Sequence, residues 1–380
     1  MEPKLGGSLP VPVVQELAKQ NLATVPPRYV RPDQHQQMIL SNSLSSSSQI
    51  PVIDMQKLSD EYLMDSELQA LHNACQEWGF FQVPTQYNYV QYLIIDQPWV
   101  DAAVVEKMKL QVQEFFNLPT EEKRKFGQEE GDIQGYGQAF VVSEEQKLDW
   151  ADLFYIVTAP TYLRKPHLIP KLPSTFRDAI EEYASQLKIL AMKILKLMAK
   201  ALGMKAEEME TLFAEGMHSM RMNYYPPCPQ PELVTGLYPH SDAIGLTILL
   251  QVNEVDALQI KKDGFWIPVA PLPNAFIINI GDILEVVTNG TYRSIEHRAT
   301  VNKEKERISV ATFLGANMDG DMGPAQSLIT PQTPPKFKRI GVAEFMKGYS
   351  LEGTSGEIIP GPYEDLGYTI LYEDNAQIII

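Results

Sequence analysis

The stretch His240-Ser241-Asp242 decides the fold, together with the apolar run of residues 246–252 that follows it. Strand side chains alternate with a period of two residues, so the His240 imidazole and the Asp242 carboxylate point the same way. One metal ion can therefore bind both. A second imidazole, that of His297, comes 55 residues after Asp242, which is far enough for the chain to return on another strand. Two imidazoles and one carboxylate can occupy one face of an octahedral Fe(II) ion and leave three positions open for ligands that react.

A second pair of residues follows ten positions after His297. Arg307 and Ser309 share one face of a predicted strand, and a guanidinium fork beside a hydroxyl suits charge-assisted, bidentate capture of a distal carboxylate. An H-x-D tripeptide alone occurs often by chance, and a lone histidine is usually a surface or core residue. The ordered set of five residues in a strand-like context favours an iron site beside a carboxylate clamp.

Short β-branched or alternating runs predict strands through the second half of the chain. They cover residues 246–252, 257–261, 266–269, 275–280, 292–301 and 307–314. Lys262-Asp263-Gly264 and Asn289-Gly290 are turn sequences typical of β-hairpins. Many short strands with frequent turns predict an α+β protein whose core is a double-stranded β-helix, a jelly-roll or cupin-like barrel flanked by helices. A non-catalytic β-sandwich is the alternative, and the ligand set argues against it.

The first half of the chain has mixed patterns. Strands are expected at residues 50–54 and 79–83, and helices at residues 11–22, 66–78, 104–116 and 175–202. The longest helix is expected to end at Gly203, and Thr175 and Asp178 have the spacing of a capping box at its start. Its apolar stripe, which includes Leu187 and Ile194, predicts packing against the barrel.

Composition excludes several classes of protein. With 380 residues, of which 44% are hydrophobic, the chain can bury a sizeable core. No run has the roughly 18 uncharged apolar residues that a membrane span needs, and the first residues lack a secretory pattern. The net charge of −16 disfavours nucleic acid as a partner. Cys75 and Cys228 are too few for a disulfide framework, which favours the reducing cytosol, so we expect a cytoplasmic protein.

Longer motifs give the chain a resemblance to a known family. They are Met222-Asn223-Tyr224-Tyr225-Pro226-Pro227-Cys228-Pro229, Gly245-Leu246-Thr247-Ile248-Leu249-Leu250-Gln251 and Leu272-Pro273-Asn274-Ala275-Phe276. With the five residues above, the chain resembles the soluble plant 2-oxoglutarate/Fe(II)-dependent dioxygenases, and within them the SRG-type and alkaloid O-demethylase (codeine O-demethylase-like) group. In that family the Asn and the second Tyr of the N-Y-Y-P-P motif help to hold 2-oxoglutarate, which points to Asn223 and Tyr225.

The resemblance implies a chemistry and a set of roles. His240, Asp242 and His297 would hold Fe(II), while 2-oxoglutarate would chelate the metal and place its distal carboxylate on Arg307 and Ser309. O2 is the co-substrate, ascorbate supports activity as a reductant, and the protein is expected to be a monomer acting on a small molecule. Family members commonly line the substrate pocket at the positions of Phe313, Leu314 and Phe140, and ordinary barrel packing is the equal alternative for Leu314. The nearby Trp150, Asp152 and Phe154 lie where relatives contribute pocket walls.

The same resemblance suggests how the chain is divided and where it departs from its relatives. We expect an N-terminal extension and flexible linker at 1–49, an N-terminal dioxygenase region at 50–170, a long packing helix region at 171–215, the jelly-roll core at 216–317 and a C-terminal segment at 318–380. Residues 84–99 replace the Asn-His-Gly motif of relatives, and the tail from about residue 351 lacks their helix pattern. Retained intron sequence or an unusual splice form would account for both, genuine divergence is the alternative, and none of the five core residues is touched.

Three functions fit these observations. The first is oxidation of a plant specialised metabolite such as an alkaloid or phenylpropanoid, by hydroxylation or by oxidative O-demethylation. The second is a flavonoid or hormone oxidase with the same chemistry. The third is a non-catalytic ligand-binding or misassembled form, which the two departures suggest. Fold alone does not choose the substrate.

Overall fold

The computed structural model describes residues 8–20, 22–31, 49–85, 99–129, 131–138, 141 and 143–347 of the 380. The Ser-rich linker at 41–48, most of the unusual segment at 84–99, Phe140 and the tail from residue 351 lie outside these residues. At the edge of the unusual segment, Pro84 still belongs to a strand, and the Thr85 amide donates to the Asn274 carbonyl at 2.7 Å. Among the described helices, none is both long and apolar enough to cross a membrane.

The larger of the two main sheets has seven antiparallel strands in the order β1-β9-β6-β11-β4-β3-β2. The strands are β1 Phe80–Pro84, β9 Ala275–Ile280, β6 Leu246–Gln251, β11 Arg307–Leu314, β4 His218–Tyr225, β3 Asp152–Ala159 and β2 Gly135–Gly137. The central strands β11 and β4 are buried along their whole length, because both faces of the sheet are covered. The strand predicted at residues 307–314 is confirmed at both ends.

The smaller sheet has four strands in the order β5-β10-β7-β8. These are β5 Leu237–His240, β10 His297–Ala299, β7 Leu258–Lys262 and β8 Phe265–Pro268, and a separate pair joins β12 Asp321–Met322 to β13 Ile340–Gly341. The β7–β8 hairpin turns at Asp263 and Gly264, with φ of 52° and 80°, as a two-residue type I′ turn requires. The jelly-roll expectation is confirmed.

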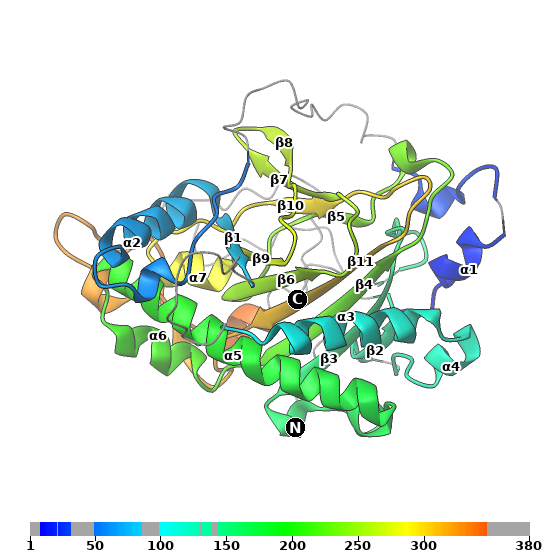
Figure 1. The fold of residues 1–380 in the computed structure, drawn as a ribbon, viewed down its shortest axis with the longest axis horizontal. Coiled ribbons are helices and arrows are strands. Elements are labelled where there is room, and N and C mark those ends of the chain that lie inside the picture. The colour runs from blue at the N-terminus through cyan, green and yellow to red at the C-terminus, as the bar shows by residue number, and fades with distance from the viewer. Residues whose placement is uncertain are drawn as a thin grey trace.

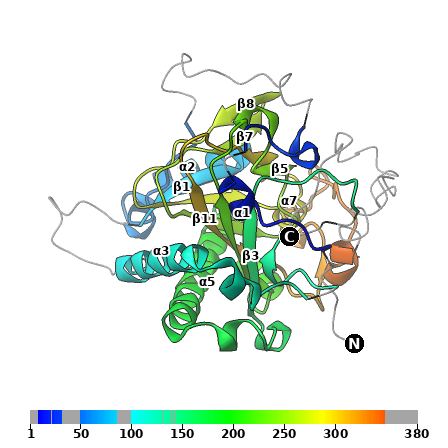
Figure 2. The same cartoon turned by 90° about the vertical axis from the view of Figure 1, so that its right-hand side faces the viewer.

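The long helices α3 (Ala102–Asn117) and α5 (Ser174–Leu202) cover the face of the larger sheet that lies away from the smaller one (Figures 1 and 2). The helices are α1 Val14–Ala18, α2 Met64–Asn73, α3 Ala102–Asn117, α4 Thr120–Arg124, α5 Ser174–Leu202, α6 Ala206–Phe213 and α7 Asp282–Val287, with a π-helical turn at Ala74–Trp78. Short 3-10 turns lie at Pro27–Tyr29, Lys57–Ser59, Thr161–Leu163, Ile169–Lys171, Pro231–Leu233 and Gln326–Leu328. Helix α5 packs on α3 and on strands β11 and β6, so its apolar stripe is core as expected.

Several local predictions are wrong. The helix expected at 11–22 spans only Val14–Ala18, and the strand expected at 50–54 is an isolated bridge between Val52 and Gln82. The strand expected at 292–301 is reduced to β10, because the residues before it form a loop. Asn289-Gly290 closes no hairpin.

The Asn289-Gly290 error has a clear physical reason. Asn289 and Gly290 have φ of 54° and 73° and follow helix α7, because a left-handed pair ends a helix as readily as it turns a hairpin. The capping box is also wrong, since the N-cap of α5 is Pro173, which has no side-chain cap, and Asp178 pairs with Arg177 at 3.5 Å. The end of the helix is as predicted, because Gly203 has φ of 66°.

Candidate metal centre

The three predicted metal ligands lie together at one end of the smaller sheet. His240 ends β5 and His297 begins β10, and the two residues are direct cross-strand partners. The Nε2 atoms of His240 and His297 lie 3.6 and 3.8 Å from Oδ1 of Asp242. All three side chains are buried, and their ligand atoms lie within 4.8 Å of one another. The H-x-D tripeptide and the returning strand therefore converge as expected.

Hydrogen bonds to the outer atoms fix how each ligand points. Nδ1 of His240 lies 2.7 Å from the Tyr238 carbonyl, and Nδ1 of His297 lies 3.0 Å from the Ile295 carbonyl. A carbonyl only accepts, so these contacts place the proton on Nδ1 and leave the Nε2 lone pair for a metal. Oδ2 of Asp242 accepts from Thr247 and, at 2.7 Å, from Asn279. Its Oδ1 is left toward the imidazoles.

The electrostatics of this cluster favour the metal-binding protonation states. Burial, with the neighbouring His297 imidazole, lowers the pKa of His240 to about 3, so its ring is neutral. Burial alone raises the pKa of Asp242, but the two imidazoles and the Thr247 and Asn279 bonds outweigh it and hold the pKa below its ordinary value. Neutral imidazoles and an ionised carboxylate are the forms that bind a divalent cation. The donor set fits Fe(II) with open positions.

The predicted clamp lies on strands β11 and β4. Arg307 pairs in register with Tyr225, and Ser309 pairs with Asn223. The Arg307 guanidinium lies 5.2 Å from the centre of the Tyr225 ring, and its Nη1 lies 3.4 Å from the Ser309 hydroxyl. Nε of Arg307 and Oδ1 of Asn223 are buried without a hydrogen-bond partner. A buried guanidinium with an open donor fits a dicarboxylate that brings its own acceptors.

Clamp and triad open into one cavity between the two sheets. Its walls come from both sheets and combine the polar site residues with apolar side chains. The lining residues are Phe80, Arg221, Asn223, Tyr225, Leu237, His240, Asp242, Thr247, Leu249, Leu258, Asn279, His297, Arg298, Ala299, Arg307, Ser309, Ala311 and Phe313. The seven residues predicted for metal and co-substrate binding come from four separate stretches of the sequence, and all seven line this cavity.

Comparison with known proteins agrees with this geometry. Residues 216–316 match the 2OG-Fe(II) oxygenase superfamily, and residues 50–172 match the N-terminal region of non-haem dioxygenases in morphine synthesis. The chain is 60% identical to oxoglutarate-dependent flavonoid 7-O-demethylase 1 of Ocimum basilicum over 90% of this chain and 88% of that protein. The chain belongs to the 2-oxoglutarate/Fe(II)-dependent dioxygenases.

Other relatives of this dioxygenase support the assignment. It is 47% identical to codeine O-demethylase of Papaver somniferum over 90% of this chain and 93% of that protein. The crystal structure of JOX2 in complex with 2OG, Fe and JA matches with a TM-score of 0.76 and 34% identity, covering 94% of this chain and 97% of that one. The dioxygenase is thus an oxidoreductase that uses iron and 2-oxoglutarate.

Of the predicted substrate-pocket residues, the structure brings one to the cavity. Phe313 lines it, whereas Leu314 points to the other side of β11 and packs in the hydrophobic core, because successive strand side chains face opposite ways. Phe140 lies outside the described residues. Nearby, Trp150 packs edge-on against Tyr29 and Phe154 stacks on Phe115, so neither is among the lining residues.

Arg221 is one of the lining residues that sequence reasoning missed. It pairs in register with Ala311, is 6% exposed, and leaves Nε and Nη1 without a hydrogen-bond partner. A buried guanidinium is costly unless it is paired, so its open donors face the cavity for acceptors that a bound molecule supplies. The signal was present, because Arg221, Asn223 and Tyr225 alternate along one strand and therefore share a face.

The remaining described histidines lie apart from the triad. His72 contacts the Tyr292 hydroxyl at 3.2 Å, and His167 lies 3.2 Å from the Glu129 carboxylate. His218 is buried at the start of β4, and burial lowers its pKa to about 4. His72 and His167 therefore have local partners, and His218 is a buried imidazole away from the triad.

When bound, iron and 2-oxoglutarate supply oxidation of a C–H bond by O2, coupled to conversion of 2-oxoglutarate into succinate and CO2. The protein orients the ligand side chains and keeps water out of the cavity. The Tyr238 and Ile295 carbonyls aim the imidazoles, and Thr247 and Asn279 hold the carboxylate. Apolar walls such as Phe80 and Phe313 exclude water from the reacting carbon.

Proposed function

We propose that this dioxygenase removes the methyl group of an aryl methyl ether in a plant specialised metabolite, a phenylpropanoid such as a flavonoid or an alkaloid. The observation that carries the proposal is the shared cavity, in which the triad and the clamp meet an apolar wall suited to a flat aromatic ring. The relatives named for O-demethylation of a flavonoid, of codeine and of thebaine, at 60%, 47% and 50% identity, support it.

The roles of the individual residues are part of the proposal. His240, Asp242 and His297 hold Fe(II), and Arg307 with Ser309 binds the distal carboxylate of 2-oxoglutarate. Tyr225 stacks under the Arg307 guanidinium, and the open oxygen of Asn223 faces the co-substrate. Phe313, at the far end of β11 from Arg307, contacts the aromatic substrate.

The reaction is balanced as follows. The methyl ether, 2-oxoglutarate and O2 give a hemiacetal, succinate and CO2, so one oxygen atom enters the methyl carbon and the other enters succinate. The hemiacetal then breaks its carbon–oxygen bond to give a phenol and formaldehyde. No further reductant is consumed in the productive cycle, and ascorbate serves to keep the iron reduced.

The test is a product assay with iron, ascorbate and 2-oxoglutarate on a panel of methoxyflavones, methoxylated alkaloids and their unmethylated parents. We expect formaldehyde and succinate in equal amounts, and a product that has lost one methylene group, only from the methyl ethers. A product that gains oxygen without formaldehyde would instead favour a flavonoid or hormone oxidase. Succinate from no member of the panel, with iron bound, would favour the non-catalytic alternative.

A further inference from the structure

The N-terminal strap, defined here as residues 8–20 and 22–31, packs against the body of the enzyme and buries several of its side chains there. Val14, Val25 and Tyr29 are buried in one apolar cluster with Trp150 and Val234. The Tyr29 and Trp150 rings meet edge to face with centroids 5.2 Å apart. The sequence predicted an N-terminal extension here, with a helix at residues 11–22. An extension with so much buried apolar surface has a fixed place.

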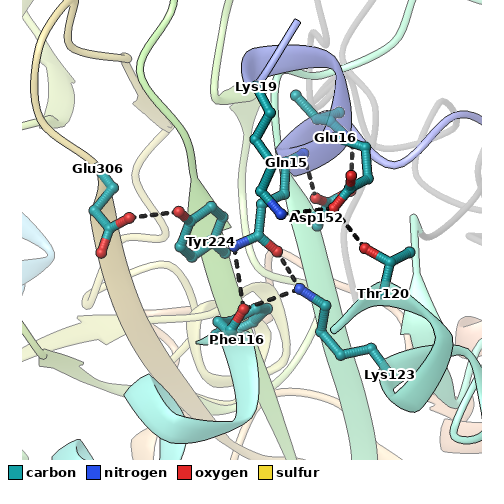
Figure 3. Close-up of polar contacts among 10 residues, drawn as sticks. Gln15, Glu16, Lys19, Phe116, Thr120, Lys123, Asp152, Tyr224 and Glu306 are labelled. Carbon is teal, nitrogen blue, oxygen red and sulfur yellow. Dashed lines mark hydrogen bonds and ion pairs between the residues drawn. The ribbon is translucent and has the colours of Figure 1, made fainter. Parts of the chain in front are cut away.

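The first half of the strap is anchored by a buried polar cluster (Figure 3). The Asp152 carboxylate accepts hydrogen bonds from the amides of Val14 and Gln15, at 2.9 and 2.8 Å, and so caps helix α1. Lys123, which is fully buried, donates to the side-chain oxygen of Gln15 and to the Phe116 carbonyl. Because both buried charged side chains take hydrogen-bond partners from the strap, they hold it in one position.

The second half of the strap ends at Arg31, beside the chain that leads into β5. The Arg31 amide donates to the Leu233 carbonyl at 2.8 Å. Its guanidinium forms an ion pair with Asp149 at 3.2 Å and lies 4.2 Å from the centre of the Tyr238 ring. Both side chains of the ion pair are largely buried, with 13% and 18% exposed.

Asp149 connects Arg31 to the metal centre through hydrogen bonds. One of its carboxylate oxygens accepts from the Thr235 hydroxyl at 3.1 Å, and the other accepts from the Tyr238 amide at 3.3 Å. The carbonyl of Tyr238 is the acceptor that orients the His240 imidazole at 2.7 Å. Pro239 follows Tyr238 and has a fixed φ, so the short path from Asp149 to His240 has little freedom.

We infer that the strap is a positioning element of the iron site, in which Arg31 acts through Asp149 and Tyr238 to set the direction of the His240 ring. The inference rests on the proposed role of His240 as a ligand. Residues that orient a metal ligand through a hydrogen bond commonly change metal affinity by roughly 10- to 100-fold when they are replaced. Arg31 is a positioning residue, because it touches neither metal nor substrate.

The experiment measures metal affinity in the full chain after removal of metal with a chelator. Co(II) is the probe, since its visible absorption reports its coordination, and circular dichroism confirms that each variant is folded. Arg31→Ala and the nearly isosteric Asp149→Asn should each weaken Co(II) binding by roughly 10- to 100-fold and alter the spectrum. The matched control is Arg28→Ala, because Arg28 is also on the strap but donates to the carbonyls of Ser143 and Gln146, at 2.7 and 3.1 Å.

The outcomes separate the two claims. Loss of Co(II) affinity in Arg31→Ala and Asp149→Asn, with Arg28→Ala unchanged, supports the inference. Wild-type affinity in Asp149→Asn, or equal losses in Arg28→Ala and Arg31→Ala, overturns it and leaves the strap a purely stabilising element. Asp242→Ala tests the ligand set itself: if that variant binds Co(II) like the wild type, the metal site is wrong and the proposed function fails with it.

Discussion

The cavity and the strap cluster both bury charged side chains, but they treat them in opposite ways. In the cavity, Arg221 and Arg307 keep donors without partners. In the buried polar cluster under the strap, Lys123 and Asp152 form hydrogen bonds with other groups of the chain. Because an unpaired buried charge is costly, the open donors of Arg221 and Arg307 suit acceptors that a ligand brings into the cavity. Lys123 and Asp152, by contrast, take their hydrogen-bond partners from the protein itself.

The largest expected effect follows from removing the one carboxylate of the triad. Asp242→Ala leaves two imidazoles, which form a weaker site for Fe(II). Succinate formation should fall by more than the roughly 100-fold that loss of an outer hydrogen-bond partner can cost. The rate of succinate release at saturating 2-oxoglutarate checks this. Retention of iron-dependent turnover would place the metal elsewhere.

The next effect concerns the clamp in the same cavity. Arg307→Lys keeps a positive charge but loses the planar fork. A lost charge-assisted hydrogen bond is worth about 1.5 to 3 kcal/mol, so KM for 2-oxoglutarate should rise by roughly 10- to 100-fold. KM for the methyl ether should change far less. Equal changes in the two constants would count against a clamp at Arg307.

Arg221 tests whether an open donor always serves a ligand. Its partner Ala311 lies between the clamp residue Ser309 and the pocket residue Phe313 along β11. Arg221→Met removes the donors while keeping an apolar stem, so KM for the organic substrate should rise by roughly tenfold, in line with one hydrogen bond to a charged group. Steady-state kinetics with both substrates decide this. Unchanged constants for both would make Arg221 a structural residue.

The smallest effect lies on the closed side of the comparison and depends on pH. Burial raises the pKa of Asp152 from 3.8 to about 6, although the Gln15 and Val14 amides partly oppose it. The folded state therefore holds this proton more tightly than the unfolded state, which adds stability below pH 3.8 that is lost as the pH rises to about 6. Asp152→Asn lacks this titration.

The wild-type free energy of unfolding, minus that of Asp152→Asn, should therefore decrease between pH 3.8 and about 6. Urea unfolding across this range measures the difference, and the subtraction removes the contribution of all other carboxyls. A difference that stays flat or grows with pH would show that Asp152 is not the buried acid described here.

Sequence patterns predicted the barrel strands well because the alternation of strand side chains is visible locally in the sequence. Alternation on β11 is local information, so its bounds and the shared face of Arg307 and Ser309 could be read directly. Alternation on β4 carried Arg221 in the same way, but without a known motif that side chain was overlooked. The burial of Arg221 and its unpaired donors became visible only in the structure.

The wrong or missed predictions have three different causes, namely a distant contact, a short element and a residue assigned by resemblance alone. Helix α1 begins later than its apolar pattern suggests, because its first amides are capped by Asp152, which lies 138 residues from Val14 in the chain. Helix α7, at Asp282–Val287, is six residues long and too short for a helical period to stand out. Leu314 was placed in the pocket by resemblance, although the alternation that Phe313 begins already turned it away.

The pairing of His240 with His297 across β5 and β10 also couples metal binding to folding. The two imidazoles meet only when these strands are in register, so a molecule in which the four-stranded sheet has opened has no site to fill. Metal that binds only the closed sheet stabilises it in proportion to the logarithm of metal concentration over Kd. Iron supply thus sets how often the small sheet opens, and the lifetime of the enzyme becomes linked to the availability of its cofactor.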